Sequence, residues 1–206
     1  MRNFSDVLRL AGFSAALLLS GFASAGSIID SIGSPTSTSG ILPIQSNAIA
    51  FSLTSDVSNV SIEALFTGST QDQQATAYLT TALGLGTTQA DVVADNSFTL
   101  ATDWVLLFSG LNLAADDYYL VLGAPLTGTT FIRTGATYVL DPIASVGSMF
   151  FSGEPNDTFA PDASFLVSSS GNRFFRLTSA EVPVPATPAL FGLGLAGLGW
   201  SSRKKA

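Results

Sequence analysis

The sequence predicts an all-β protein: a single β-sandwich, jelly-roll-like, between an N-terminal signal peptide and a short C-terminal transmembrane helix. Two observations lead to this prediction. Short runs rich in β-branched and aromatic residues recur along the chain, with Gly, Pro, Asn or Asp between them roughly every 8 to 12 residues. In two of these runs, 49–53 and 60–66, apolar residues recur at every second position with mostly polar or small residues between them. Such alternation buries one face of a strand and leaves the other face in water.

The 206 residues divide into four expected segments. They are a signal peptide (1–25), a flexible leader (26–46), the β-sandwich domain (47–180) and a C-terminal tail (181–206). The signal peptide has Arg2 and Arg9 around a basic start, followed by an apolar run. Ala23 and Ala25 form an A-x-A cleavage pattern, so cleavage is expected before Gly26. The leader is expected because residues 33–40 consist of Ser, Thr, Gly and Pro and contain no large apolar side chain that could be buried.

The strands of the domain follow in order. Alternation is clearest at 49–53 and 60–66. Further strands are expected at 75–83, 97–100, 104–111, 118–122, 129–133, 136–140, 148–151, 164–167 and 173–178. Residues 72–83 also have some helix propensity, but their threonines favour a strand. Asp95 and Asn96 are expected in a turn.

The charge of the region between the two terminal segments is strongly negative. From Gly26 to Ser202 the chain has three arginines, no lysine and fourteen acidic residues, a net charge of −11. Binding of nucleic acid or of anionic lipid depends on cations that neutralise phosphates. Neither is therefore expected as a partner.

The chain contains neither cysteine nor histidine. Disulfides, thiolate nucleophiles, Ser-His-Asp triads and histidine-ligated zinc are therefore excluded. No cofactor is expected, with calcium as the single exception considered. Asp116 and Asp117 are adjacent acids that could supply oxygen ligands to calcium from a loop. Composition favours the simpler interpretation, in which they lie in a solvated turn.

Aromatic residues are the candidates for contact with a glycan. Tyr118 and Tyr119 are neighbours on an expected strand, so their side chains point to opposite faces and one of them is the preferred glycan contact. Trp104 is the alternative. It falls in phase with Leu106 and Phe108, however, which favours a place in the core.

The tail is the most informative stretch of the sequence. Residues 186–202 carry no charge, and as a helix they would be about 25 Å long at ~1.5 Å per residue. This is slightly short for a bilayer core of about 30 Å. The basic end Arg203, Lys204 and Lys205 favours the cytoplasmic side, which places the domain on the opposite side of the membrane.

The tail resembles the PEP-CTERM protein-sorting signal of Gram-negative bacteria. The resemblance rests on the motif Val182, Pro183, Val184 and Pro185, the Gly- and Leu-rich apolar stretch after it, and the basic end. Val184 stands where the Pro-Glu-Pro triplet has Glu, which makes the motif similar to the VPLPA-type variant. The resemblance implies that an exosortase-type enzyme processes the chain after the tail has held it transiently in the inner membrane. A plain C-terminal anchor is the alternative.

Three functions are compatible with the sequence. We expect an exported protein of the cell surface or extracellular matrix, with a non-enzymatic structural or adhesive β-sandwich. The alternative is a carbohydrate-binding module, calcium-dependent or not, that acts on extracellular polysaccharide. An enzyme acting on polysaccharide would need two converging carboxylates. No spacing of acidic residues in this sequence suggests such a pair, so no catalytic residue is expected.

Overall fold

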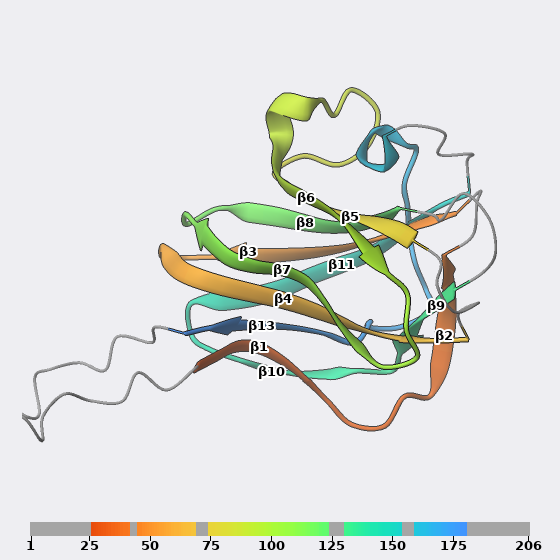
Figure 1. Cartoon of the computed structure of the whole chain (residues 1–206), viewed down its shortest axis with the longest axis horizontal. Helices are drawn as coiled ribbons and strands as arrows, with labels where there is room; N and C mark the ends of the chain where they lie inside the picture. The colour runs from red at the N-terminus through yellow and green to blue at the C-terminus, as the bar shows by residue number, and fades with distance from the viewer. Residues whose placement is uncertain (1–25, 42–44, 69–73, 124–129, 154–158, 181–206) are drawn as a thin grey trace, which may run out of the picture. The chain divides into compact units, whose positions relative to one another are not determined.

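Two antiparallel β-sheets face each other in the computed structural model, which describes residues 26–41, 45–68, 74–123, 130–153 and 159–180 (Figure 1). The seven-stranded sheet has the order β10 (Thr137–Leu140), β1 (Gly26–Ile32), β13 (Phe175–Ser179), β4 (Val57–Thr67), β9 (Thr130–Thr134), β2 (Ser37–Ile41), with β7 (Trp104–Leu113) also paired to β4. The six-stranded sheet has the order β12 (Leu166–Val167), β11 (Ala144–Ser152), β3 (Ser46–Leu53), β8 (Asp117–Gly123), β5 (Gln74–Thr80), β6 (Val92–Thr99). Two short 3-10 helices, η1 (Gln89–Asp91) and η2 (Ala160–Asp162), lie in connections. The predicted β-sandwich is thereby confirmed.

The alternating runs form the inner faces of both sheets. In β3, buried Ile49 and Phe51 lie on either side of half-buried Ala50, and in β4 Ile62 and Phe66 are buried between half-buried neighbours. These side chains belong to one apolar cluster that fills the space between the sheets. Residues 72–83 have some helix propensity, but the sequence predicts a strand there. The structure has β5 in this segment, over Gln74–Thr80, so the strand prediction is also confirmed.

The flexible leader expected over residues 26–46 is wrong for the described part of that segment. β1 lies between β10 and β13, and β2 pairs with β9. Ile28 and Ile29 in β1 are 3% and 0% exposed. The Ser- and Thr-rich β2 is ordered because antiparallel pairing satisfies its backbone, and its inward Ser39 donates a hydrogen bond to Asn47 Oδ1 at 2.8 Å.

The turn expected at Asp95 and Asn96 is also wrong. Both residues lie in the middle of β6, opposite Tyr78 and Ala77 of β5. Asn96 stays in the strand because its side chain points toward the other sheet, where Nδ2 donates to the Leu107 carbonyl oxygen at 2.7 Å. The amide thus crosslinks the two sheets instead of turning the chain.

Residues 25–180 form one compact unit. The predicted signal peptide, with Ala23 and Ala25, and the predicted tail helix lie outside the described residues. Among the described residues, no helix has the length and apolarity that a bilayer crossing requires.

Candidate functional site

The outer face of the seven-stranded sheet carries an unusual set of side chains around β4. Because Ile62, Ala64 and Phe66 point inward and are buried, the residues between them point outward. The strands beside β4 add outward residues at the same level. We call this set the β4 face: Glu63, Leu65, Thr67, Trp104, Leu106, Phe131, Arg133 and Arg176.

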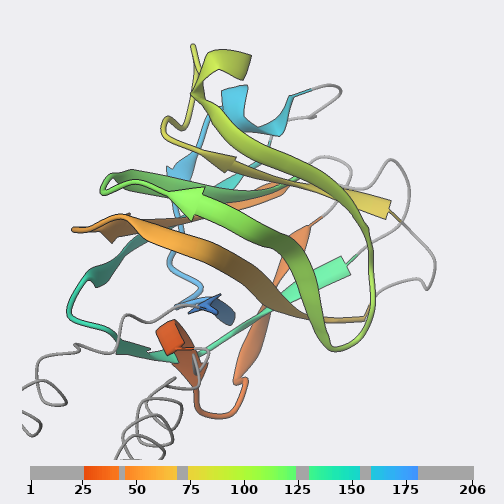
Figure 2. The same cartoon turned by 60° about the vertical axis from the view of Figure 1, so that its left-hand side comes forward.

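Strand register fixes the arrangement of the β4 face. On one side of β4, Glu63 lies opposite Leu106, and Leu65 lies opposite Trp104, both in β7. Figure 2 shows β4 and β7 running side by side. On the other side of β4, β13 and β9 follow one another along the same edge: Arg176 lies opposite Glu63, and Phe131 lies opposite Thr67.

Trp104 belongs to this outer face, so the sequence-based placement in the core is wrong. Its phase with Phe108 is broken by a bulge: Leu106 pairs with Glu63 but Phe108 pairs with Ile62, which leaves Leu107 as the extra residue. Leu107 and Phe108 are therefore both buried. Trp104 and Leu106 lie on the outside, where Trp104 is half-buried and Leu106 is 52% exposed.

A charged group holds the tryptophan ring in place. The Arg176 guanidinium carbon lies 4.5 Å from the centroid of the Trp104 ring, a cation–π arrangement. Arg176 Nε also donates to Glu63 Oε2 at 2.5 Å. The hydrogen bond to Glu63 raises the pKa of Arg176 above its usual value, and the charges of Glu63, Asp30 and Asp103 act in the same direction. The three side chains thus form one ordered group.

Arg133 occupies the other end of the β4 face. It follows buried Ile132 in β9, so its side chain points outward on the same face as that of Phe131. Its Nη2 donates to Thr67 Oγ1 at 2.8 Å. Among the described residues no carboxylate forms an ion pair with it, although ten acidic residues are described. Arg133 is half-buried and therefore accessible in part.

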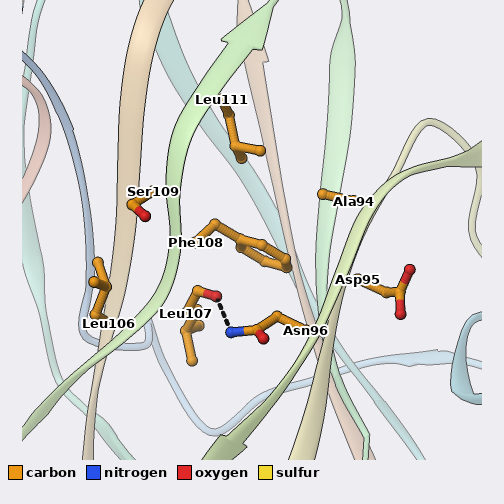
Figure 3. A pocket seen from close by; sticks show the side chains of 8 residues that line it. All are labelled: Ala94, Asp95, Asn96, Leu106, Leu107, Phe108, Ser109 and Leu111. Carbon is orange, nitrogen blue, oxygen red and sulfur yellow. Dashed lines mark hydrogen bonds between the residues drawn. The ribbon is translucent and has the colours of Figure 1, made fainter.

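A groove adjoins the β4 face where β6 and β7 meet. The two strands are edge strands of different sheets, and the hollow between them has a volume of about 340 Å³. Figure 3 shows Phe108 and Leu111 reaching from β7 toward β6, with the hydrogen bond from Asn96 to Leu107 at the base. Asp95, the single acid among the described lining residues, points away from Phe108. Leu106 lines the groove and belongs to the β4 face, so the two features are continuous.

The predicted calcium residues accept hydrogen bonds from protein groups, one within their own turn and one from β3. Asp116 Oδ1 accepts a hydrogen bond from the Asp117 amide at 2.8 Å. Asp117 Oδ1 accepts one from the Ser52 hydroxyl. Within the part of the chain that the structure describes, no group of three or more acidic side chains is placed to hold a metal ion.

The two predicted glycan-contact tyrosines do point to opposite faces. Tyr118 is 3% exposed, and its hydroxyl donates to the Ala114 carbonyl oxygen at 2.9 Å. Tyr119 lies on the outer face of the six-stranded sheet, half-buried and edge-to-face with Phe150 at 6.3 Å between ring centroids. Neither tyrosine lies on the β4 face.

Sequence reasoning missed the β4 face because its members come from four strands and meet only through register. One signal was available. Glu63, Leu65 and Thr67 are the outward residues of a recognised alternating strand, and Arg176 holds the matching position in the last predicted strand. The bulge that moves Trp104 outward has no recognisable pattern in the sequence.

The comparisons with known proteins concern the tail. The family model of the PEP-CTERM protein-sorting motif matches residues 181–204. No curated protein matches the chain. The match covers the predicted motif Val182 to Pro185 and the first two residues of the basic end, Arg203 and Lys204, and it extends over none of the β-sandwich. The chain thus ends in a PEP-CTERM protein-sorting motif and is an exported protein sorted through its tail.

Proposed function

We propose that this chain is a protein of the cell surface or extracellular matrix whose β-sandwich has a non-enzymatic, structural or adhesive role. The observation that carries the proposal is the sorting motif at residues 181–204, which directly follows one compact domain, residues 25–180. A sorting tail delivers whatever domain precedes it. The surface of that domain should therefore contain the functional contacts.

A non-enzymatic role is supported by how the acidic groups are used. On the β4 face, Glu63 is held by Arg176. Among the described residues that line the groove, Asp95 is the single acid. Hydrolysis of a glycosidic bond commonly uses two carboxyl groups about 5 to 10 Å apart.

The second candidate is a carbohydrate-binding module, and the β4 face favours it. A half-buried tryptophan, a half-buried phenylalanine and a partly accessible arginine lie on the outer face of one sheet. Aromatic rings and arginines are frequent anchors of binding surfaces.

Before release, the chain would be held in the inner membrane by the tail and cut by an exosortase-type enzyme. The test is a double substitution, Pro183→Ala with Pro185→Ala, in a producing cell. We expect the variant to accumulate in the inner membrane fraction. Pro188→Ala, in the same tail but outside the segment Val182 to Pro185, is the control and should be released normally. Normal release of the double variant would contradict the proposal.

A further inference from the structure

We propose that the β4 face is a binding site for an uncharged polysaccharide, with Trp104 and Arg133 as its principal contacts. This inference rests on the proposed function, since a surface protein is the kind that meets such a polymer. It assigns the adhesive role to a specific surface. It also places the contact on the seven-stranded sheet, on the other side of the sandwich from Tyr119.

The size of the β4 face suits a short stretch of sugar chain. Three adjacent strand positions span about 10 Å across the sheet, and from Glu63 to Thr67 the strand runs about 13 Å. The face therefore offers on the order of 130 Å². Stable protein–protein interfaces bury about 800 Å² on each partner. A protein partner would have to extend far beyond this set of residues.

The charges of the β4 face favour an uncharged ligand. Of the three arginines that the structure describes, Arg133 and Arg176 have accessible side chains, and Arg173 is 0% exposed. Glu63 and Asp103 lie beside Arg176, so its positive charge is balanced locally. The surrounding domain is strongly acidic. A polyanion would be repelled by it, and a polycation would be drawn to acidic surface everywhere rather than to this face.

The chemistry of the face matches a polyhydroxylated ring. Trp104, Phe131, Leu65 and Leu106 supply an apolar surface for the C–H faces of sugars. Arg133 supplies N–H donors for hydroxyl oxygens, and the carboxylates supply acceptors. Because Arg176 and Glu63 already fix the tryptophan ring, little side-chain entropy would be lost on binding.

An added peptide strand is a poorer occupant of this region. β7 is the exposed edge, and a ladder along it would be interrupted twice. The Leu107 carbonyl is taken by Asn96, and Gly110 has φ +71° beside a register shift. Bulges of this kind are a common protection of edge strands against pairing.

The experiment is isothermal titration of the purified full chain, in detergent, with a panel of soluble glycans. The neutral probes are cello-, laminari-, xylo- and manno-oligosaccharides, and the charged probes are polygalacturonate and oligolysine. We expect saturable binding of at least one neutral probe, insensitive to salt. Trp104→Leu should weaken it roughly tenfold or more, the size of effect that loss of one aromatic anchor produces. Arg133→Met should weaken it severalfold.

The matched controls separate this surface from its alternatives. Tyr119→Leu removes an aromatic ring from the outer face of the other sheet, and Val139→Ser changes an exposed apolar residue, 54% exposed, at the far edge of the same sheet. Both should leave binding unchanged. Melting curves confirm that each variant is folded at the titration temperature.

Three results would overturn the inference. They are no saturable binding to any neutral probe, tighter binding of a charged probe, or binding that survives Trp104→Leu but is lost in Tyr119→Leu. A surface-located protein that fails this titration would leave the proposed function standing. A protein that stays in the inner membrane would contradict the proposed function whatever its affinity for glycans.

Discussion

Arg173 and Asn47 lie 126 positions apart in the chain, and both are fully buried. The Nε and Nη2 of Arg173 donate to the same Asn47 Oδ1, with Nε at 2.9 Å. The other acceptors of Nη2 are neutral as well: two serine hydroxyls and the Phe150 carbonyl. Burial lowers the pKa of Arg173 to about 10. A buried guanidinium whose described acceptors are all neutral oxygens is costly, so each acceptor is important for stability.

Replacing Asn47 by leucine should therefore destabilise the fold by about 3 kcal/mol, because two hydrogen bonds to a buried charge are lost. Urea unfolding measures the change. Asn112→Leu is the control, since exposed Asn112 accepts a single hydrogen bond from the Asn59 amide at 3.3 Å. It should change the free energy of unfolding by less than about 0.5 kcal/mol. Equal effects of the two substitutions would contradict the role of Asn47.

The environment of Tyr138 leads us to expect that the free energy of unfolding falls at alkaline pH. Its hydroxyl donates to the Arg173 carbonyl oxygen at 2.6 Å, and burial raises the pKa of the phenol above its usual value. In the pH range above about 10 the unfolded phenol loses its proton while the folded one keeps it. The stabilisation from Tyr138 is thus complete below pH ~10 and falls as pH rises further.

Unfolding experiments between pH 8 and 11 test this. We expect Tyr138→Phe to lose less stability than the wild type over the upper part of the range. Identical pH dependence of the two proteins would show that the phenol titrates normally in the folded state.

Gly68 sets the end of β4 beneath Phe131. Its φ is +67°, and a Cβ there would lie 3.1 Å from the Phe131 ring carbon Cδ2. Gly68→Ala should therefore cost about 1 to 2 kcal/mol, from backbone strain and crowding. Gly153→Ala is the control: a Cβ at Gly153 meets nothing within 4 Å, and its φ is not in the left-handed range. A Gly68→Ala variant as stable as the wild type would mean that this strand end adapts freely.

The ion pair of the β4 face should contribute little to folding. The side chains of Arg176 and Glu63 are 35% and 22% exposed. Pairs that are this accessible stabilise proteins by less than about 1 kcal/mol. Glu63→Gln should accordingly shift the free energy of unfolding by less than that amount. A larger loss would mean that the β4 face serves mainly stability, which would weaken the case for a binding role.

The sequence was sufficient for the fold class, because alternation in 49–53 and 60–66 reports burial directly. It failed where burial depends on partners that are distant in sequence. The sequence predicts a loop at Ser39, but in the structure Ser39 lies in a strand and is hydrogen-bonded to Asn47 and Arg173. The sequence predicts a turn at Asn96, but its side-chain amide donates a hydrogen bond to the Leu107 carbonyl oxygen of the other sheet. For the site, the sequence supplied the residue types, but Trp104 reached the outer face through a bulge that no local pattern records.

The central claim is that the C-terminal tail is a sorting signal that is cut on export. The most direct measurement is the intact mass of the protein recovered from the surface or medium of producing cells. We predict a mass that corresponds to a chain ending within or shortly after the motif Val182 to Pro185, without Arg203, Lys204 and Lys205. An exported protein whose mass includes the complete tail, in cells that have the processing enzyme, would contradict the account.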